Sequence, residues 1–154
     1  MYKRQVPDQL LELDCDECLI SGSLDVIDWA SFTSLNYLRL SDAGITGTIP
    51  AEIGELSDLL ELSLSRNQLM GTIPGAVGNM QSLEEIFLDE NLLTGTIPRS
   101  LLLAPSLQRV ALDGNYLEDD LTEEFCPLQF DLFLVGCGKN MTSQQVLCDC
   151  CTTC

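Results

Sequence analysis

The chain has 154 residues, with 24 acidic against 7 basic side chains and a net charge of −17 at pH 7. This balance argues against nucleic acid and anionic membrane surfaces as partners, because both require Lys and Arg to neutralise phosphate. The sequence has no histidine, which excludes Ser-His and Cys-His catalysis and histidine-ligated metal sites. No apolar run is long enough to span a membrane, and the length is that of one domain.

The first expected element is an irregular opening turn of a repeat. Leu10 and Leu13 occupy positions that are apolar in the later turns. Cys15 and Cys18 have the C-x-x-C spacing of half a zinc site or of a redox pair. We favour a structural interpretation, in which Cys15 fills an inward position and Cys18 takes the place of an Asn, because Cys is among the most buried residue types.

Four regular turns follow, and three of them close with a variant of the phrase Thr-Gly-Thr-Ile-Pro at intervals of 24 residues. Such an interval indicates stacked repeats, since one turn cannot bury its apolar face alone. Each turn fits the pattern L-x-x-L-x-L-x-x-N-x-L, with Ala43 in the Asn place of the first turn. The residues that fill the pattern are Leu35, Leu38, Leu40 and Ile45; Leu59, Leu62, Leu64, Asn67 and Leu69; Leu83, Ile86, Leu88, Asn91 and Leu93; and Leu107, Val110, Leu112, Asn115 and Leu117.

The pattern also predicts the local structure of each turn. Side chains alternate along a strand, so the fourth and sixth residues point inward and the residue between them points outward. An Asn such as Asn91 follows the strand, where its short amide can bond freed backbone groups. Gly95 permits a sharp bend without a Cβ clash, and Pro98 lacks the N–H that further pairing would need.

The last expected element is a degraded sixth turn followed by a cysteine-rich C-terminal cap, over residues 132–154, after a solenoid over residues 1–131. An even number of cysteines concentrated in the tail indicates disulfides and a secreted or cell-surface protein, and a four-thiolate metal site is the alternative for the tail. No secretory signal is visible, so we expect the chain to be a fragment of a longer protein. The disulfide candidates are Cys126, Cys137, Cys148, Cys150, Cys151 and Cys154.

The L-T-G-x-I-P phrase and the 24-residue period resemble the plant-specific class of leucine-rich repeats, found in ectodomains of plant receptor-like kinases and in polygalacturonase-inhibiting proteins. The resemblance implies an α/β solenoid, a right-handed superhelix with a concave parallel β-sheet and a convex side of loops and 3₁₀ segments over residues 51–58, 75–82 and 99–106. It also implies that Gly-x-Ile-Pro begins a second short strand. The cysteine-rich tail resembles the endings of repeat proteins in diatoms and related algae.

The outward positions of the concave strands form the candidate binding surface. Exposed aromatic and Arg side chains favour binding, and the surrounding acids would attract a cationic peptide or protein. The leading hypothesis is therefore a non-enzymatic recognition module in extracellular signalling or adhesion, with no cofactor and no metal. The expected ligand contacts are Tyr37, Arg39, Glu61, Arg66, Glu85, Phe87 and Arg109.

Three other functions remain open at this point. An acidic wall or matrix protein would use its carboxylates to bind calcium. An inhibitor of a cell-wall hydrolase is a further alternative. Catalysis would pair Glu85 with Asp89 or Asp113 as acid and base, but an open sheet offers no enclosed pocket to separate their pKa values.

Overall fold

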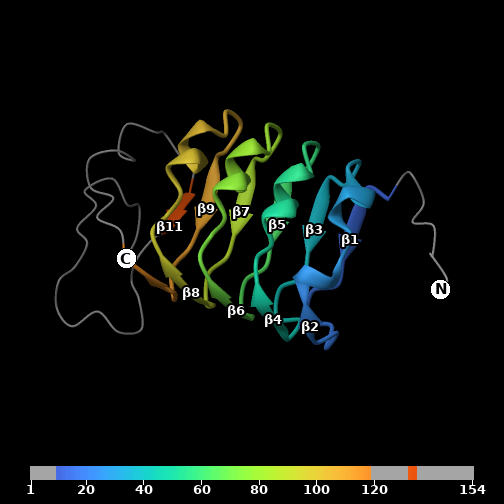
Figure 1. Cartoon of the computed structure of the whole chain (residues 1–154), viewed down its shortest axis with the longest axis vertical. Helices are drawn as coiled ribbons and strands as arrows, with labels where there is room; N and C mark the ends of the chain where they lie inside the picture. Colours follow the sequence, from blue (N-terminus) through green and yellow to red (C-terminus); the bar gives the residue numbers. More distant parts are fainter. Residues whose placement is uncertain (1–9, 119–131, 135–154) are drawn as a thin grey trace.

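The structure is a computed structural model that describes residues 10–118 and 132–134, and these residues form a stack of parallel turns (Figure 1). The first strands of the turns make one six-stranded parallel sheet, in the order β1-β3-β5-β7-β9-β11. Equivalent residues pair from turn to turn, as Leu62 does with Ile86 and Ile86 with Val110. The strands are β1 (Glu12–Asp14), β3 (Tyr37–Arg39), β5 (Glu61–Ser63), β7 (Glu85–Phe87), β9 (Arg109–Ala111) and β11 (Leu132–Leu134). The expected leucine-rich solenoid is confirmed.

A second parallel sheet of five strands runs beside the first, in the order β10-β8-β6-β4-β2. We expected the second strand of each turn to begin at Gly-x-Ile-Pro, and this was wrong, because β6 and β8 end at Gly71 and Gly95 instead. Both glycines have left-handed φ angles, 77° and 73°, which turn the chain and end its extended pairing. The strands are β2 (Gly22–Ser23), β4 (Ile45–Thr48), β6 (Gln68–Gly71), β8 (Leu92–Gly95) and β10 (Tyr116–Leu117).

Short 3₁₀ helices form the convex side, and three of them lie within the segments expected there. Their stacking depends on glycine, since a Cβ on Gly78 would lie 2.4 Å from the carbonyl oxygen of Ser100 in the next turn. The convex segments can therefore approach closely only where a turn lacks a side chain. The helices are η1 (Leu24–Val26), η2 (Trp29–Phe32), η3 (Ala51–Glu55), η4 (Gly75–Asn79) and η5 (Arg99–Leu103).

The core between the two sheets and the convex helices consists of the inward leucines and isoleucines of the pattern. Leu62, Leu64 and Ile86 have no exposed surface. At the N-terminal end, Trp29 is also buried, and its indole N–H donates a hydrogen bond of 3.0 Å to the carbonyl of Leu24. Burial of one large side chain contributes about 1.5–3 kcal/mol, so the repeated apolar positions dominate the stability of the stack.

A ladder of buried Asn side chains joins the two sheets. The amide nitrogen of Asn91 donates to the carbonyls of Leu64 and Leu88 at 2.9 and 3.1 Å, and its oxygen accepts from the N–H of Leu69 at 3.0 Å. Asn67 and Asn115 make the equivalent bonds in their own turns. Each Asn therefore bonds freed backbone groups, as the sequence pattern predicted, and it also ties its own turn to the preceding one.

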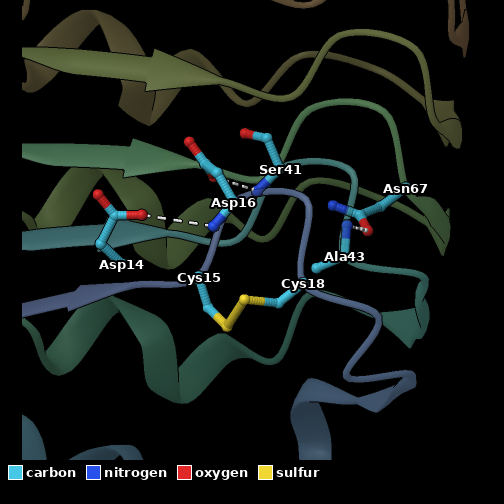
Figure 2. The surroundings of a disulfide bond; sticks show 7 residues. All are labelled: Asp14, Cys15, Asp16, Cys18, Ser41, Ala43 and Asn67. Carbon is cyan, nitrogen blue, oxygen red and sulfur yellow. Dashed lines mark hydrogen bonds between the residues drawn. A yellow bond between two sulfur atoms is a disulfide. The ribbon is translucent and has the colours of Figure 1, made fainter.

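The first turn replaces this ladder with a disulfide between Cys15 and Cys18 (Figure 2). Our expectation of two separate buried cysteines needs correction, although Cys15 does pack against the core. The two cysteines occupy the positions of Leu64 and Asn67, which a hydrogen bond of 3.0 Å joins in a regular turn. A covalent bond thus links the same two positions. Above it, the N–H of Ala43 donates to the Asn67 oxygen at 3.2 Å.

The cysteine-rich tail lies outside the described residues. The disulfide candidates from Cys126 to Cys154 and the domain boundary at residue 131 therefore stay predictions. Of the expected last turn, the structure describes β11, which pairs in parallel with β9. Within the described part, no helix has the length and apolar character that crossing a membrane requires.

Candidate functional site

The outward positions of the first sheet bring most of the expected contact residues into two rows. Tyr37, Glu61, Glu85 and Arg109 are paired neighbours in one row. The second row contains Arg39 and Phe87, which are separated by a serine, while Arg66 follows β5 in the adjoining loop. The structure therefore places these side chains on one surface, as required for a shared ligand, although ligand contact itself stays a prediction.

Arg39 is the centre of a charged cluster at the N-terminal end of this surface. Its guanidinium lies 2.7 Å from Glu12 and 2.5 Å from Glu61, and it stacks over the Tyr37 ring at 4.7 Å. The hydrogen bond to Glu61 raises the pKa of Arg39, with further contributions from the charges of Glu61, Glu12 and Asp14. Arg39 thus links three adjacent strands, and its contact with a ligand stays a prediction.

A second cluster lies toward the C-terminal end, around Phe87. The guanidinium of Arg109 is 2.9 Å from Glu85 and 5.5 Å from the centre of the Phe87 ring. These side chains belong to neighbouring strands, β7 and β9, and all three are at least partly exposed. An arginine held over an aromatic ring contributes about 0.5–1 kcal/mol at an exposed site. The contact between Arg109 and Phe87 therefore orients the ring but adds little to the stability of the fold.

Three serines separate the two clusters, and sequence reasoning did not anticipate their burial. Ser41, Ser63 and Ser65 are outward-facing but only 5–8% exposed. The hydroxyls of Ser41 and Ser63 are 2.8 Å apart, and Ser65 donates to a carboxylate oxygen of Asp89. Small side chains at these positions are covered by their longer neighbours, which a pattern of apolar and polar residues does not reveal.

Acidic residues line the edge of the surface where the strands end. The residue just before each Asn position has a left-handed φ, for example 53° at Asp42, Arg66 and Glu90. Arg66 is half exposed and lies 3.9 Å from Asp42, a distance at which an exposed ion pair contributes little. Among the three candidate arginines it is therefore the least engaged with other residues of the chain.

Asp113 lies at the C-terminal end of the same edge and is partly buried. Burial raises its pKa, the charge of Asp89 raises it further, its own backbone N–H lowers it, and the charge of Glu90 raises it. The charge of Asp89 thus acts on Asp113, which follows it by 24 residues in the sequence. Within residues 10–118 and 132–134, however, no cluster of three or more acidic, Cys or His residues is arranged to hold a metal ion.

The second sheet has an outer surface of a different kind. The exposed residues of its five strands are all uncharged, in a chain of net charge −17. Met70, Leu92 and Tyr116 each expose 41–49% of their surface there. Threonines occupy most of the other exposed positions, among them Thr46 and Thr94, whose hydroxyls donate to carbonyls of the preceding turn. Sequence reasoning treated Thr-Gly-Thr-Ile-Pro as a structural phrase and missed this surface.

Stacked turns with a parallel concave sheet and an Asn ladder define a solenoid repeat protein, and comparison with known families agrees. Two family models, both described as leucine rich repeat, match residues 59–117 and 34–56, which together exceed half of the chain. The chain belongs to the leucine-rich repeat proteins. No curated protein sequence matches it significantly.

Solved structures of plant proteins resemble the chain closely in fold. The BIR2 ectodomain from Arabidopsis thaliana is 30% identical, with a TM-score of 0.65, over 70% of this chain and 56% of that one. The Arabidopsis receptor kinase HAESA, solved with the peptide hormone IDA and the co-receptor SERK1, is 32% identical with a TM-score of 0.65, over 70% of this chain and 18% of that one. A plant ice-binding protein is 30% identical with a TM-score of 0.64, over 70% and 35%. The chain thus spans about half or less of these relatives.

Proposed function

We propose that the chain is a non-enzymatic recognition module that binds a peptide or protein segment across the outer face of the first sheet. The observation that supports this most is the pairing of two partly exposed aromatic rings, Tyr37 and Phe87, with arginines that hold their orientation. Rigid aromatic side chains at the centre of a polar surface are typical of binding hot spots. The structure of HAESA with a peptide hormone shows that a relative of this fold binds such a ligand.

The ligand we propose is cationic. Arg39 and Arg109 are both paired with carboxylates, so neither offers an unopposed positive charge to a partner. The remaining acids at the strand ends leave the surface negative, which would speed the approach of Lys and Arg side chains and would weaken as salt rises. An apolar ligand residue would contact Phe87, because this end of the surface is the more exposed. The side chain of Arg109 is 45% exposed and that of Arg39 is 26% exposed.

We place this function outside the cell, at its surface or in the secreted fraction. The Cys15–Cys18 disulfide is of a kind that persists in oxidising compartments. The BIR2 structure is described as an ectodomain, and a chain of the same architecture with a disulfide in its first turn fits the same environment.

Binding to an array of synthetic peptides, each with Lys or Arg around one apolar residue, tests the proposal. Phe87→Ala and Tyr37→Ala should each weaken the tightest peptide about tenfold or more, because hot-spot truncation costs at least about 2 kcal/mol. Tyr116→Ala, an exposed aromatic on the second sheet, is the matched control and should leave the affinity unchanged. Binding that ignores both first-sheet variants would refute the concave surface as the site.

A second candidate function is binding to ice, and the uncharged outer surface of the second sheet favours it. Ice is a neutral, repeating lattice, and a charged side chain would hold a hydration shell of its own against it. One structure similar to this chain is a plant ice-binding protein. Inhibition of ice recrystallisation by the oxidised chain tests this candidate, and an inactive chain would exclude it without affecting the peptide-binding proposal.

A further inference from the structure

We infer that the ice-contacting atoms are the hydroxyls of one row of threonines, Thr48, Thr72 and Thr96, an assignment that rests on the second candidate function above. Each is the Thr of Gly-Thr-Ile-Pro, and all three are exposed. Thr48 is the last residue of β4, and the other two directly follow β6 and β8. The row therefore crosses three successive turns along the axis of the solenoid.

The spacing of this row follows from the sheet. Adjacent strands of a parallel sheet lie about 4.8 Å apart, and the 24-residue repeat brings an equivalent Thr to each successive turn. Within the sheet, Thr48 is paired with Met70 and Met70 with Leu92, so each Thr of the row is displaced along the strand direction from the Thr of the turn before. A partner that repeats at a constant interval can then contact every turn in the same way.

The glycines of the next turn fix the orientation of these threonines. A Cβ at Gly71 would lie 3.2 Å from the methyl carbon of Thr48, and one at Gly95 would lie 2.9 Å from that of Thr72. The methyl groups of Thr48 and Thr72 thus pack over the glycines that follow them by one turn. Because β-branched side chains have few χ1 states, this contact also fixes where the hydroxyl points.

The hydroxyls of the row are not used within the described residues. Thr48, Thr72 and Thr96 make no side-chain hydrogen bond there, whereas Thr46 and Thr94 in the neighbouring row donate to Gly22 and Gly71. One row of hydroxyls therefore holds the turns together, and the other is left to solvent. A preorganised hydroxyl binds an ordered water without losing rotamer freedom at the moment of contact.

Apolar side chains beside the row complete the surface. Met70 and Leu92 are exposed next to the threonines, and no exposed residue in the strands of this sheet is charged. Apolar groups restrict the orientation of adjacent water without binding it. The surface thus combines fixed hydroxyls with apolar side chains beside them, and it lacks the charges that cover the first sheet.

The test compares ice recrystallisation in sucrose solution with the oxidised chain and its variants. Thr72→Lys should lose most of the activity, because its ammonium places a strongly hydrated charge in the middle of the row. Thr33→Lys makes the same change at an exposed Thr at the end of η2, away from this sheet, and should keep the activity.

Because Thr72 packs on Gly95, a second variant guards against a folding defect. Gln68→Lys adds the same charge to an exposed position of β6, and it should reduce activity while leaving the melting temperature unchanged. If the chain is active but both Thr72→Lys and Gln68→Lys match the wild type, another surface binds ice and this assignment fails. If the wild-type chain is inactive, the second candidate function fails, and the assignment fails with it.

Discussion

Equivalent positions on the two sheets differ in how far they vary from turn to turn. On the first sheet, one row changes from Tyr37 to Glu61 and ends at Arg109, whereas Thr48 and Thr72 show the same residue repeated on the second. Both sheets belong to the same turns and enclose the same core. A varied, charged surface suits a ligand with a particular sequence, whereas an uncharged one that repeats a Thr in three turns suits a partner that repeats.

The largest effect should come from disrupting the core that both sheets share, because both surfaces depend on it. Leu64→Asp should destabilise the chain by more than about 4 kcal/mol, because it removes a fully buried leucine and buries an unpaired charge. Denaturant unfolding followed by circular dichroism measures the loss. Arg66→Ala, two residues away and exposed, should change stability by less than about 0.5 kcal/mol. Equal stability of Leu64→Asp and wild type would refute the inward register.

A smaller effect should follow from cutting the connection between the sheets. Asn91→Ala removes hydrogen bonds to Leu64, Leu88 and Leu69. The two carbonyls keep their bonds from Asn67 and Asn115, so the N–H of Leu69 is the group left buried without its acceptor. We expect a loss of about 2–3 kcal/mol. Amide hydrogen exchange should show faster exchange at Leu69. Asn79→Ala, an exposed Asn at the end of η4, is the control and should show neither change.

The smallest predicted effect concerns pH and the edge of the first sheet. Burial and the charge of Asp89 raise the pKa of Asp113 above its ordinary 3.8, so the folded state binds this proton more tightly than the unfolded state. Stability from this group is therefore present below 3.8 and is lost as pH rises through the folded pKa. Asp113→Asn should gain stability relative to wild type at neutral pH but not below pH 3.8.

Unfolding curves of wild type and Asp113→Asn at the two pH values measure this difference. Glu52→Gln, at an exposed position in η3, changes the charge equally and should give the same small effect at both. A gain for Asp113→Asn that does not depend on pH would show that folding does not raise the pKa of Asp113 in the wild type.

Sequence was sufficient for the fold because each turn repeats the same physical requirements. Leu62 and Leu64 alternate with polar residues at strand period, Asn67 follows where the strand ends, and Gly71 permits the bend. Each feature recurs at the same interval, so an error in one turn would conflict with its neighbours. The Cys15–Cys18 disulfide was missed because consensus positions indicate burial and not a covalent bond.

The candidate surfaces were only partly predictable, because they depend on contacts between turns. Strand alternation placed Phe87 on the outer face, and this was confirmed. Alternation did not predict that Glu61 would engage Arg39 or that Ser63 would be covered, since both depend on the rotamers of residues 22 or more positions away. The uncharged second sheet was overlooked because two of its strands, β6 and β8, end at the glycine where they were expected to begin.

The direction of the Asn ladder has a consequence for how the chain is made. Asn67, Asn91 and Asn115 reach back to carbonyls of the preceding turn, at Leu40, Leu64 and Leu88. During synthesis from the N-terminus, a turn therefore acquires these bonds only after the next Asn, 27 residues beyond the carbonyl it binds, has left the ribosome. The newest turn is always incomplete, and the solenoid closes each turn one step behind the growing end.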